Sequence, residues 1–310
     1  MTAKTLPPKT RYPRANLAAC MLPWTEQYKL DVGVFEQHVQ EAIDGGYKSI
    51  YLMGTAGEGY ALTDTQFKEV VGHFARLTVK PGLDPQIGLI SLSMEQILER
   101  IAWSRDQGIR MFQISLPSWG ALDADEIMLF FKTVCGAFPD CRFLHYNLPR
   151  TKHIITGAEY RRIMDEVPNL VATKNSTSDY ARVADLMKHA GELQHFFLEG
   201  GFAFGSLLGE CSLLCSYDAL FPKMTWEFFE AGGKQDKDTL FRIHIFLHEV
   251  DKILFAHCPR SMIDGSYDKT FLWLRNSKFS NRMLPPYLGL SAEESTICRQ
   301  QFEKYYRHIS

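Results

Sequence analysis

Lys174 and Tyr146 are the residues of this sequence whose types and positions most directly suggest chemistry. Lys174 ends the apolar run 169–174, and Tyr146 ends the run 142–146, 28 residues earlier (174 − 146). A lysine at the mouth of a buried strand is poorly solvated, which favours its neutral amine. A neutral amine can attack a ketone to form a Schiff base, and a nearby phenol can move the protons that this reaction requires. The alternative is a lysine that caps the strand and extends its amine to water.

Eight short apolar runs alternate with amphipathic segments, a pattern typical of β-strands alternating with α-helices. The predicted strands cover residues 17–22, 49–53, 86–91, 111–116, 142–146, 170–174, 195–198 and 212–215. The predicted helices that follow them cover residues 34–45, 65–78, 94–107, 125–138, 158–167, 180–189 and 202–208. Helix start signals agree with this assignment, because Thr63 and Gln66 form a capping-box pattern and Ser93 and Asp123 can cap the next helices.

Strands that alternate with helices imply a parallel sheet, and eight repeats fit a closed barrel. The alternative is an open doubly wound sheet, which usually carries a Gly-rich phosphate turn after its first strand, but residues 17–24 contain none. After Cys215 the strands end, and helices are predicted at 224–231, 238–254 and 292–305. We therefore expect an α/β fold with three parts. These are a (β/α)8 TIM barrel over residues 14–220, a C-terminal helical extension over 221–310, and a flexible N-terminal arm over 1–13.

Composition narrows the class of protein. The chain has 34 Lys and Arg against 36 Asp and Glu, so no surface for nucleic acid or membrane is expected. The seven cysteines are odd in number and lack paired spacing, which is typical of reduced intracellular thiols. No stretch approaches the ~20 apolar residues of a membrane span, and residues 1–14 do not resemble a secretory signal. We expect a cytoplasmic protein.

In such a barrel the C-terminal ends of the strands form the active site. The second predicted strand ends in the turn Gly54-Thr-Ala-Gly57, which has little side-chain bulk, so its N–H groups can converge on a carboxylate. It can also be an ordinary Gly-rich turn. The Thr55 hydroxyl can relay a proton to Tyr146. Because side chains alternate along a strand, a Tyr146 that points into the barrel turns His145 towards the helices, so we interpret His145 as structural.

Two other kinds of site are less well supported. A metal-dependent aldolase needs ligands from several strand ends, and only Glu58 and Glu199 qualify there. Gly200-Gly201 precedes a helix whose N-terminus can bind phosphate, but no basic residue lies beside it. A lysine, a tyrosine and a small anion-binding turn together favour Schiff-base chemistry on a 2-oxo acid.

These residues resemble the motifs of the dihydrodipicolinate synthase and N-acetylneuraminate lyase family, the pyruvate-type class I aldolases. The segment 54–58 resembles the family's Gly-Thr/Ser-Thr-Gly-Glu turn, and 146–149 matches its Tyr-Asn-x-Pro motif. Lys174 falls at its Schiff-base lysine, at the family's 28-residue separation from the tyrosine. Residues 282–291 resemble the segment before the family's last helix. The resemblance covers residues 14–305.

The resemblance implies roles for the matching residues. Lys174 would form an imine with a pyruvate-like 2-oxo acid, and Tyr146 would shuttle protons. Thr55 would orient that phenol, while the backbone at Ala56 and Gly57 would hold the carboxylate. The family implies no metal and no organic cofactor. It also implies a homotetramer built from dimers.

Leu213 falls near a family position that packs against the keto acid, whereas three other positions depart from the pattern. Ala56 replaces a threonine and loses its hydroxyl. Trp119 falls where the synthase branch has a relay tyrosine from a neighbouring subunit, and an indole cannot relay protons. The synthase's arginine for the second substrate's carboxylate aligns with Thr151, one residue after Arg150. We expect Trp119 to form a wall for the aldehyde or to plug a subunit interface.

The main departures from the family pattern concern residues that would contact the second substrate, whereas the residues for the keto acid are nearly complete. We therefore expect a Schiff-base lyase that makes or breaks a C–C bond between a 2-oxo acid and an aldehyde, of the aldolase, hydratase-aldolase or 2-keto-3-deoxy sugar acid type. The alternatives are 4-hydroxy-tetrahydrodipicolinate synthase, an inactive keto-acid-binding barrel, and an unrelated phosphate-sugar barrel enzyme. The aldehyde, the direction and any dehydration step are open at this stage.

Overall fold

The computed structural model describes residues 10–258 and 261–309. Eight parallel strands form one sheet in chain order. They are β1 (Leu17–Cys20), β2 (Ser49–Leu52), β3 (Asp84–Leu89), β4 (Met111–Ile114), β5 (Arg142–Asn147), β6 (Leu170–Asn175), β7 (Gln194–Phe197) and β8 (Ser212–Leu213). A parallel bridge between Asn16 and Leu213 joins β8 to the segment that leads into β1. The sheet therefore closes on itself, which confirms the predicted barrel.

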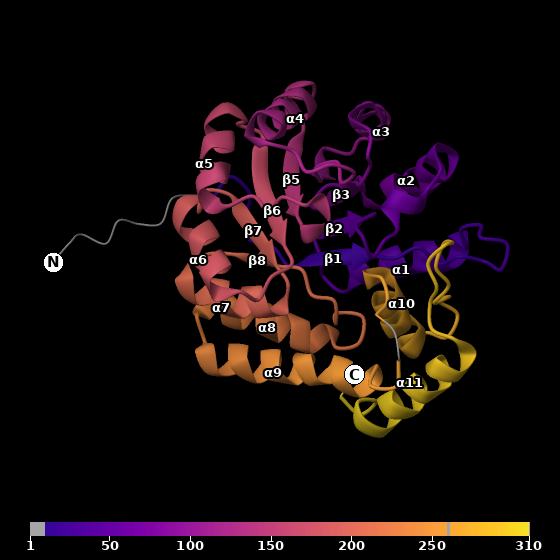
Figure 1. The fold of residues 1–310 in the computed structure, drawn as a ribbon. Helices are drawn as coiled ribbons and strands as arrows, with labels where there is room; N and C mark the ends of the chain where they lie inside the picture. The colour runs from indigo at the N-terminus through magenta and orange to yellow at the C-terminus, as the bar shows by residue number, and fades with distance from the viewer. Residues whose placement is uncertain (1–9, 259–260, 310) are drawn as a thin grey trace.

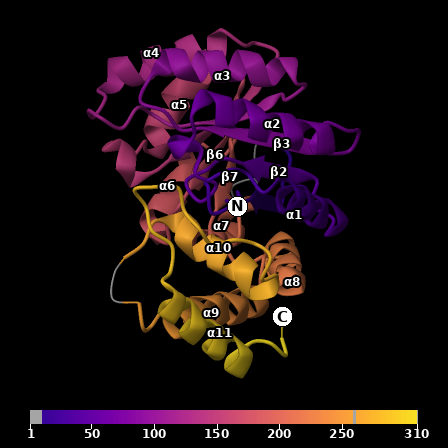
Figure 2. The same ribbon diagram turned by 90° about the vertical axis from the view of Figure 1, so that its right-hand side faces the viewer.

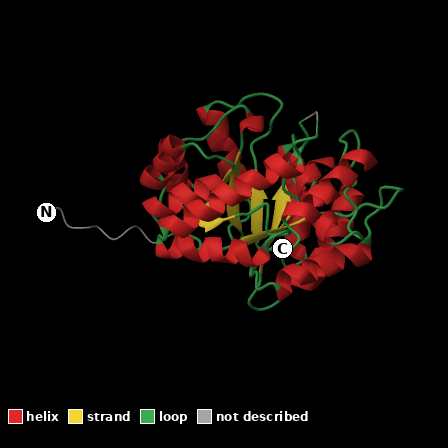
Figure 3. Ribbon diagram, turned by 90° about the horizontal axis from the view of Figure 1, so that it is seen from below, coloured by secondary structure: helices red, strands yellow, loops and turns green. Residues whose placement is uncertain are grey.

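Seven helices follow the first seven strands and surround the sheet (Figures 1 and 3). They are α1 (Val32–Asp44), α2 (Asp64–Thr78), α3 (Met94–Asp106), α4 (Ala124–Gly136), α5 (Gly157–Glu166), α6 (Tyr180–His189) and α7 (Glu199–Leu208). Local sequence sets where they begin: Thr63 and Gln66 form the predicted capping box, and Ser93 and Asp123 accept backbone N–H bonds at the starts of α3 and α4.

Alternation along the strands divides the core into two layers. Outward side chains such as Phe143 pack against the helices, and inward ones such as Leu144 fill the barrel. Within the predicted N-terminal arm, residues 1–9 lie outside the described residues. Tyr12, in contrast, is buried in the inner layer, and its hydroxyl donates to Asp84 (2.6 Å) at the start of β3. This end of the arm is therefore fixed to the base of the barrel.

Four further helices complete the described chain: α8 (Pro222–Lys234), α9 (Lys237–Leu254), α10 (Asp264–Arg275) and α11 (Ala292–Tyr305). Three of them match predicted helices, but α10 does not. It lies between the barrel and α11 (Figures 1 and 2). Its first turn contacts the turn after β2, because a Cβ on Gly265 would lie 2.6 Å from the Ala56 carbonyl oxygen. Among the described residues, no helix is long and apolar enough to cross a membrane.

Candidate active site

Lys174 and Tyr146 are direct neighbours across the pair β5 and β6. Lys174 is 8% exposed and Tyr146 is 2% exposed. The Lys174 Nζ lies 4.0 Å from the centroid of the Tyr146 ring and 5.5 Å from that of Tyr51 on β2. No hydrogen bond or short ion pair with another described residue is recorded for this amine. Parallel pairing therefore brings together the two residues that the sequence separates by 28 positions.

The amine opens into a cavity of about 120 Å³, here called the lysine cavity. Gly54, Ala56 and Gly57 of the turn after β2 line one of its walls. The N–H groups of Glu58 and Gly59 close this turn on the carbonyls of Thr55 and Gly54 (3.1 and 3.4 Å), whereas none is recorded for Ala56 or Gly57 among the described residues. Two backbone donors beside the lysine suit a carboxylate.

Close backbone approach explains the glycines of the turn. A Cβ on Gly57 would lie 2.8 Å from the Met53 nitrogen, and one on Gly59 would lie 2.5 Å from the Met53 oxygen. Met53 itself has a φ of 67°, in the left-handed region that is uncommon for non-glycine residues. The turn is tight because β2 ends directly beneath it, and any side chain at either glycine would displace the backbone.

Glu58, considered above as a metal ligand, instead anchors this turn. Its carboxylate accepts from the Trp24 indole (2.8 Å) and the Leu284 N–H (2.6 Å), and it forms an ion pair with Lys269 of α10. Glu58 and Lys269 are both fully buried, and desolvation lowers the pKa of Lys269 to about 8. The network ties the turn to the C-terminal extension.

Thr55 lies on the other side of the turn. It is buried, and its hydroxyl has no hydrogen-bond partner among the described residues. It lines a second cavity of about 580 Å³, here called the wide cavity. The neighbours Gly54 and Ala56 line the lysine cavity, so the turn separates the two spaces. A hydroxyl without a partner is available to the Tyr146 phenol or to a ligand.

Two predicted binding residues lie elsewhere. Leu213 is buried in the outer layer and lines neither cavity, whereas Leu214 lines the lysine cavity. Leu214 thus faces the cavity and Leu213 faces away from it, because consecutive side chains in extended backbone face opposite ways. Trp119 is 84% exposed, and its carbonyl accepts a hydrogen bond from the Lys152 ammonium group. In the single chain Trp119 reaches neither cavity.

Three carboxyl groups in the lysine cavity were not predicted: Asp218, which follows β8, and Asp264 and Asp268 of α10. Desolvation raises the pKa of Asp218 to about 7 and that of Asp268 well above its usual range, and Lys174 moderates the shift of Asp268. The spacing of Asp264 and Asp268 (i, i+4) places both on one helix face, which is the signal that the sequence offered.

Arg150 and Thr151 both line the wide cavity, but their side chains make different contacts. Thr151 is buried, and its hydroxyl donates to backbone carbonyls of Leu148 and His153 (2.8 and 3.0 Å). Arg150 lines the wide cavity, and its guanidinium donates to both carboxylate oxygens of Asp264 (2.8 and 3.3 Å). Both residues belong to a single turn of 3-10 helix at Pro149–Thr151.

The remaining interpretations concern metal and His145. Within residues 10–258 and 261–309 no group of three or more His, Cys, Asp or Glu residues is placed to hold a metal ion. Glu199, the other metal candidate, accepts the Ser216 N–H (2.7 Å). His145 is buried, faces α5 as predicted, and shares a hydrogen bond with the Tyr160 hydroxyl (2.6 Å).

The comparisons with known proteins agree with this geometry. The model of the dihydrodipicolinate synthetase family matches residues 13–303. A 4-hydroxy-tetrahydrodipicolinate synthase from Aquifex aeolicus is 23% identical, over 94% of this chain and 97% of that protein. An N-acetylneuraminate lyase from Rattus norvegicus is 25% identical, over 77% of this chain and 78% of the relative.

A solved structure shows the same fold. A prophage protein of the dihydrodipicolinic acid synthase family from E. coli K12, in complex with pyruvate, superposes with a TM-score of 0.84 at 15% identity, covering 94% of this chain and 98% of that one. Fold and site define a barrel of the pyruvate-type class I aldolases, the predicted class of carbon–carbon lyase. The chain belongs to the dihydrodipicolinate synthetase family.

Proposed function

We propose that this protein is a Schiff-base-forming lyase that makes or breaks a C–C bond between a pyruvate-type 2-oxo acid and an aldehyde. The observation that carries the proposal is the pairing of Lys174 with Tyr146 at the lysine cavity. The turn of Ala56 and Gly57 lines the same cavity, and no backbone hydrogen bond joins their N–H groups to another described residue. In the family to which the chain belongs, these positions match the imine-forming lysine and its proton-transfer tyrosine.

Each residue of the site has its own role in this Schiff-base reaction. The Lys174 amine adds to the ketone carbon and water leaves, which forms an imine that withdraws electrons from the neighbouring carbon. Loss of a proton from that carbon gives an enamine, which attacks the aldehyde carbon; the reverse sequence cleaves the bond. We assign the proton transfers to Tyr146, the orientation of its phenol to Thr55, and the binding of the carboxylate to the turn at Ala56 and Gly57.

A second candidate is 4-hydroxy-tetrahydrodipicolinate synthase, which is the name of the Aquifex aeolicus relative. Its support is sequence similarity over nearly the whole chain. Against it stands Arg150, the residue nearest to the family's carboxylate-gripping arginine, because Asp264 already holds it. The homotetramer, the cytoplasmic location and the role of Trp119 stay predictions.

Deuterium exchange tests the proposal without knowledge of the aldehyde. In D2O, the enamine step should exchange the methyl protons of pyruvate, and proton NMR follows the loss of their signal. We expect rapid exchange with the wild type and none above background with Lys174→Ala. Tyr146→Phe should slow it by about 10²–10⁴-fold, the usual contribution of general acid–base catalysis. Equal exchange by wild type and Lys174→Ala would refute the imine.

A further inference from the structure

The wide cavity adjoins the place where the imine would form. It begins at Thr55, whose neighbours line the lysine cavity, and its volume of about 580 Å³ lies in the range of cavities that hold small organic ligands. The Arg150–Asp264 ion pair lies between the two spaces, because Arg150 lines the wide cavity and Asp264 lines the lysine cavity. The second substrate therefore has room here, next to the reacting carbon.

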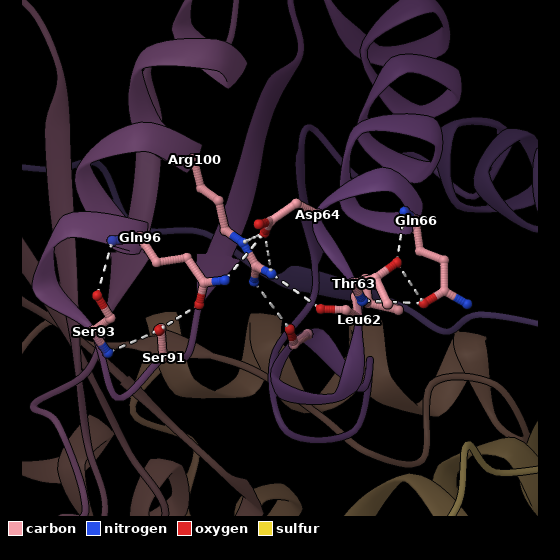
Figure 4. Close-up of polar contacts among 9 residues, drawn as sticks. Leu62, Thr63, Asp64, Gln66, Ser91, Ser93, Gln96 and Arg100 are labelled. Atoms are coloured by element: carbon pink, nitrogen blue, oxygen red, sulfur yellow. Dashed lines mark hydrogen bonds and ion pairs between the residues drawn. The ribbon is translucent and has the colours of Figure 1, made fainter.

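Arg100, a cation in the wall of this cavity, is already neutralised. Its side chain is buried, and it donates to the Asp64 carboxylate through Nε (3.1 Å) and Nη2 (2.8 Å) and to the Leu62 carbonyl (3.0 Å) (Figure 4). Gln96 donates to the same Asp64 oxygen (3.1 Å) and accepts from Ser91 (2.7 Å). This network leaves no guanidinium N–H pair free for a ligand carboxylate.

Arg150 is neutralised as well, in a bidentate pair with Asp264. Both side chains are partly exposed, Arg150 at 52% and Asp264 at 38%, so the pair is not needed to fill the core. A bidentate arginine–carboxylate pair uses the same two N–H groups that would grip a carboxylate on the substrate. An acidic aldehyde would have to displace Asp264, and it would meet the charge of Asp264 itself.

The rest of the wall combines aliphatic and uncharged polar side chains. The aliphatic side chains that line it are Leu62, Ile90, Leu92, Leu116, Leu148 and Ile263. Two buried hydroxyls in the wall, Thr55 Oγ1 and Tyr60 Oη, have no partner among the described residues. The cavity thus offers hydrophobic surface interspersed with hydroxyl groups, including those of Ser91, Ser93, Ser115 and Ser118.

We propose that the wide cavity takes an uncharged aldehyde, and that Asp264 sets this preference by holding Arg150. The inference rests on the proposed function, since it names the class of aldehyde that the enamine attacks. Asp264 acts as a specificity-determining residue through Arg150. Its removal frees a guanidinium for acidic aldehydes.

The test compares benzaldehyde with 4-carboxybenzaldehyde, which differ only by one carboxylate far from the aldehyde. The readout is the ratio of kcat/KM for their condensation with pyruvate, followed by chromatography and mass spectrometry. We expect the wild type to prefer benzaldehyde at least 10-fold. Asp264→Asn should shift the ratio at least 10-fold towards the acidic aldehyde, and Asp264→Asn combined with Arg150→Gln should lose that shift. Asp125→Asn, which removes an exposed carboxylate on α4, controls for net charge.

Borohydride trapping of pyruvate on the wild type is carried out in parallel. It distinguishes a failure of the proposed function from a failure of the inference about the aldehyde. No adduct would overturn the proposed function and the inference together. An adduct combined with a wild-type preference for the acidic aldehyde would overturn the inference alone. An adduct combined with an unchanged ratio in Asp264→Asn, or with turnover of neither aldehyde, would likewise overturn only the inference.

Discussion

Strand pairing and burial both constrain the Lys174 side chain. Strand pairing fixes its Nζ 4.0 Å from the centre of the Tyr146 ring, and the neighbouring barrel interior keeps most of the side chain from water. The carboxyl groups nearby, Asp218 and Asp268, favour their neutral forms because desolvation raises the pKa of both. Lys174 makes no ion pair with these carboxyl groups, so no bond within the described residues has to break before a ketone approaches its amine.

The titration of Asp218 should make the folding stability of the protein depend on pH. Its pKa is about 7 in the folded chain, against an ordinary value near 4, so between these values the folded protein holds a proton that the unfolded chain has lost. Folding stability should therefore fall as the pH rises from about 4 to 7 and level off above. The raised pKa of Asp268 acts in the same direction.

Asp218→Asn should remove part of the loss of folding stability that accompanies the rise in pH. Thermal unfolding followed by circular dichroism at pH 5 and pH 8 should show the variant gaining stability over the wild type as the pH rises. The same variant with Asp268→Asn should flatten the profile further. Parallel pH profiles for the wild type and both variants would contradict the assignment.

At the element scale, the turn after β2 depends on α10. Glu58 and Lys269 form a fully buried ion pair, and Glu58 also accepts from Trp24 and the Leu284 N–H. Removing one partner of a buried pair leaves an uncompensated charge, which costs about 3–5 kcal/mol. Glu58→Gln should lower the free energy of unfolding by that amount and weaken keto-acid binding, because the turn that holds the carboxylate loses its anchor.

Urea unfolding measures the first effect, and the pyruvate dependence of deuterium exchange measures the second. Glu227→Gln is the matched control: Glu227 pairs with Arg242 at the surface, where both side chains are more than half exposed, so its loss should cost about 0–1 kcal/mol. If the two variants proved equally stable, the anchoring role of Glu58 would be refuted.

These elements also show which parts of the structure can be predicted from the sequence. Strand runs and helix caps predicted the barrel, since both depend on local patterns, and the position of Lys174 and Tyr146 at strand ends predicted their meeting. The helix α10 was missed because it buries Ser266, Lys269 and Thr270, which interrupts the apolar periodicity of an amphipathic helix. The i, i+4 spacing of Asp264 and Asp268 indicates a shared helix face. The packing of that helix against the barrel mouth is long-range, and no local pattern predicts it.

At the scale of the whole molecule, Trp119 is the residue least explained by a single chain. It is 84% exposed, although tryptophan is usually well buried. The sequence resemblance places it where the synthase branch has a tyrosine from a neighbouring subunit, so we expect it to lie in an interface. Light scattering should give four times the 35.5 kDa mass of one chain, and Trp119→Ser should shift the population to smaller species. A monomeric wild type would contradict the tetramer, and a variant that stays tetrameric would favour the aldehyde wall.

The central claim is that Lys174 forms an imine with a 2-oxo acid. The most direct measurement is intact-mass spectrometry after borohydride reduction in the presence of pyruvate, on the wild type and on Lys174→Ala. We predict one reduced pyruvate bound to the wild type, located at Lys174 by peptide mapping, and no adduct on the variant. An adduct of equal amount on both proteins, or no adduct on the wild type with pyruvate or with longer 2-oxo acids, would contradict this claim.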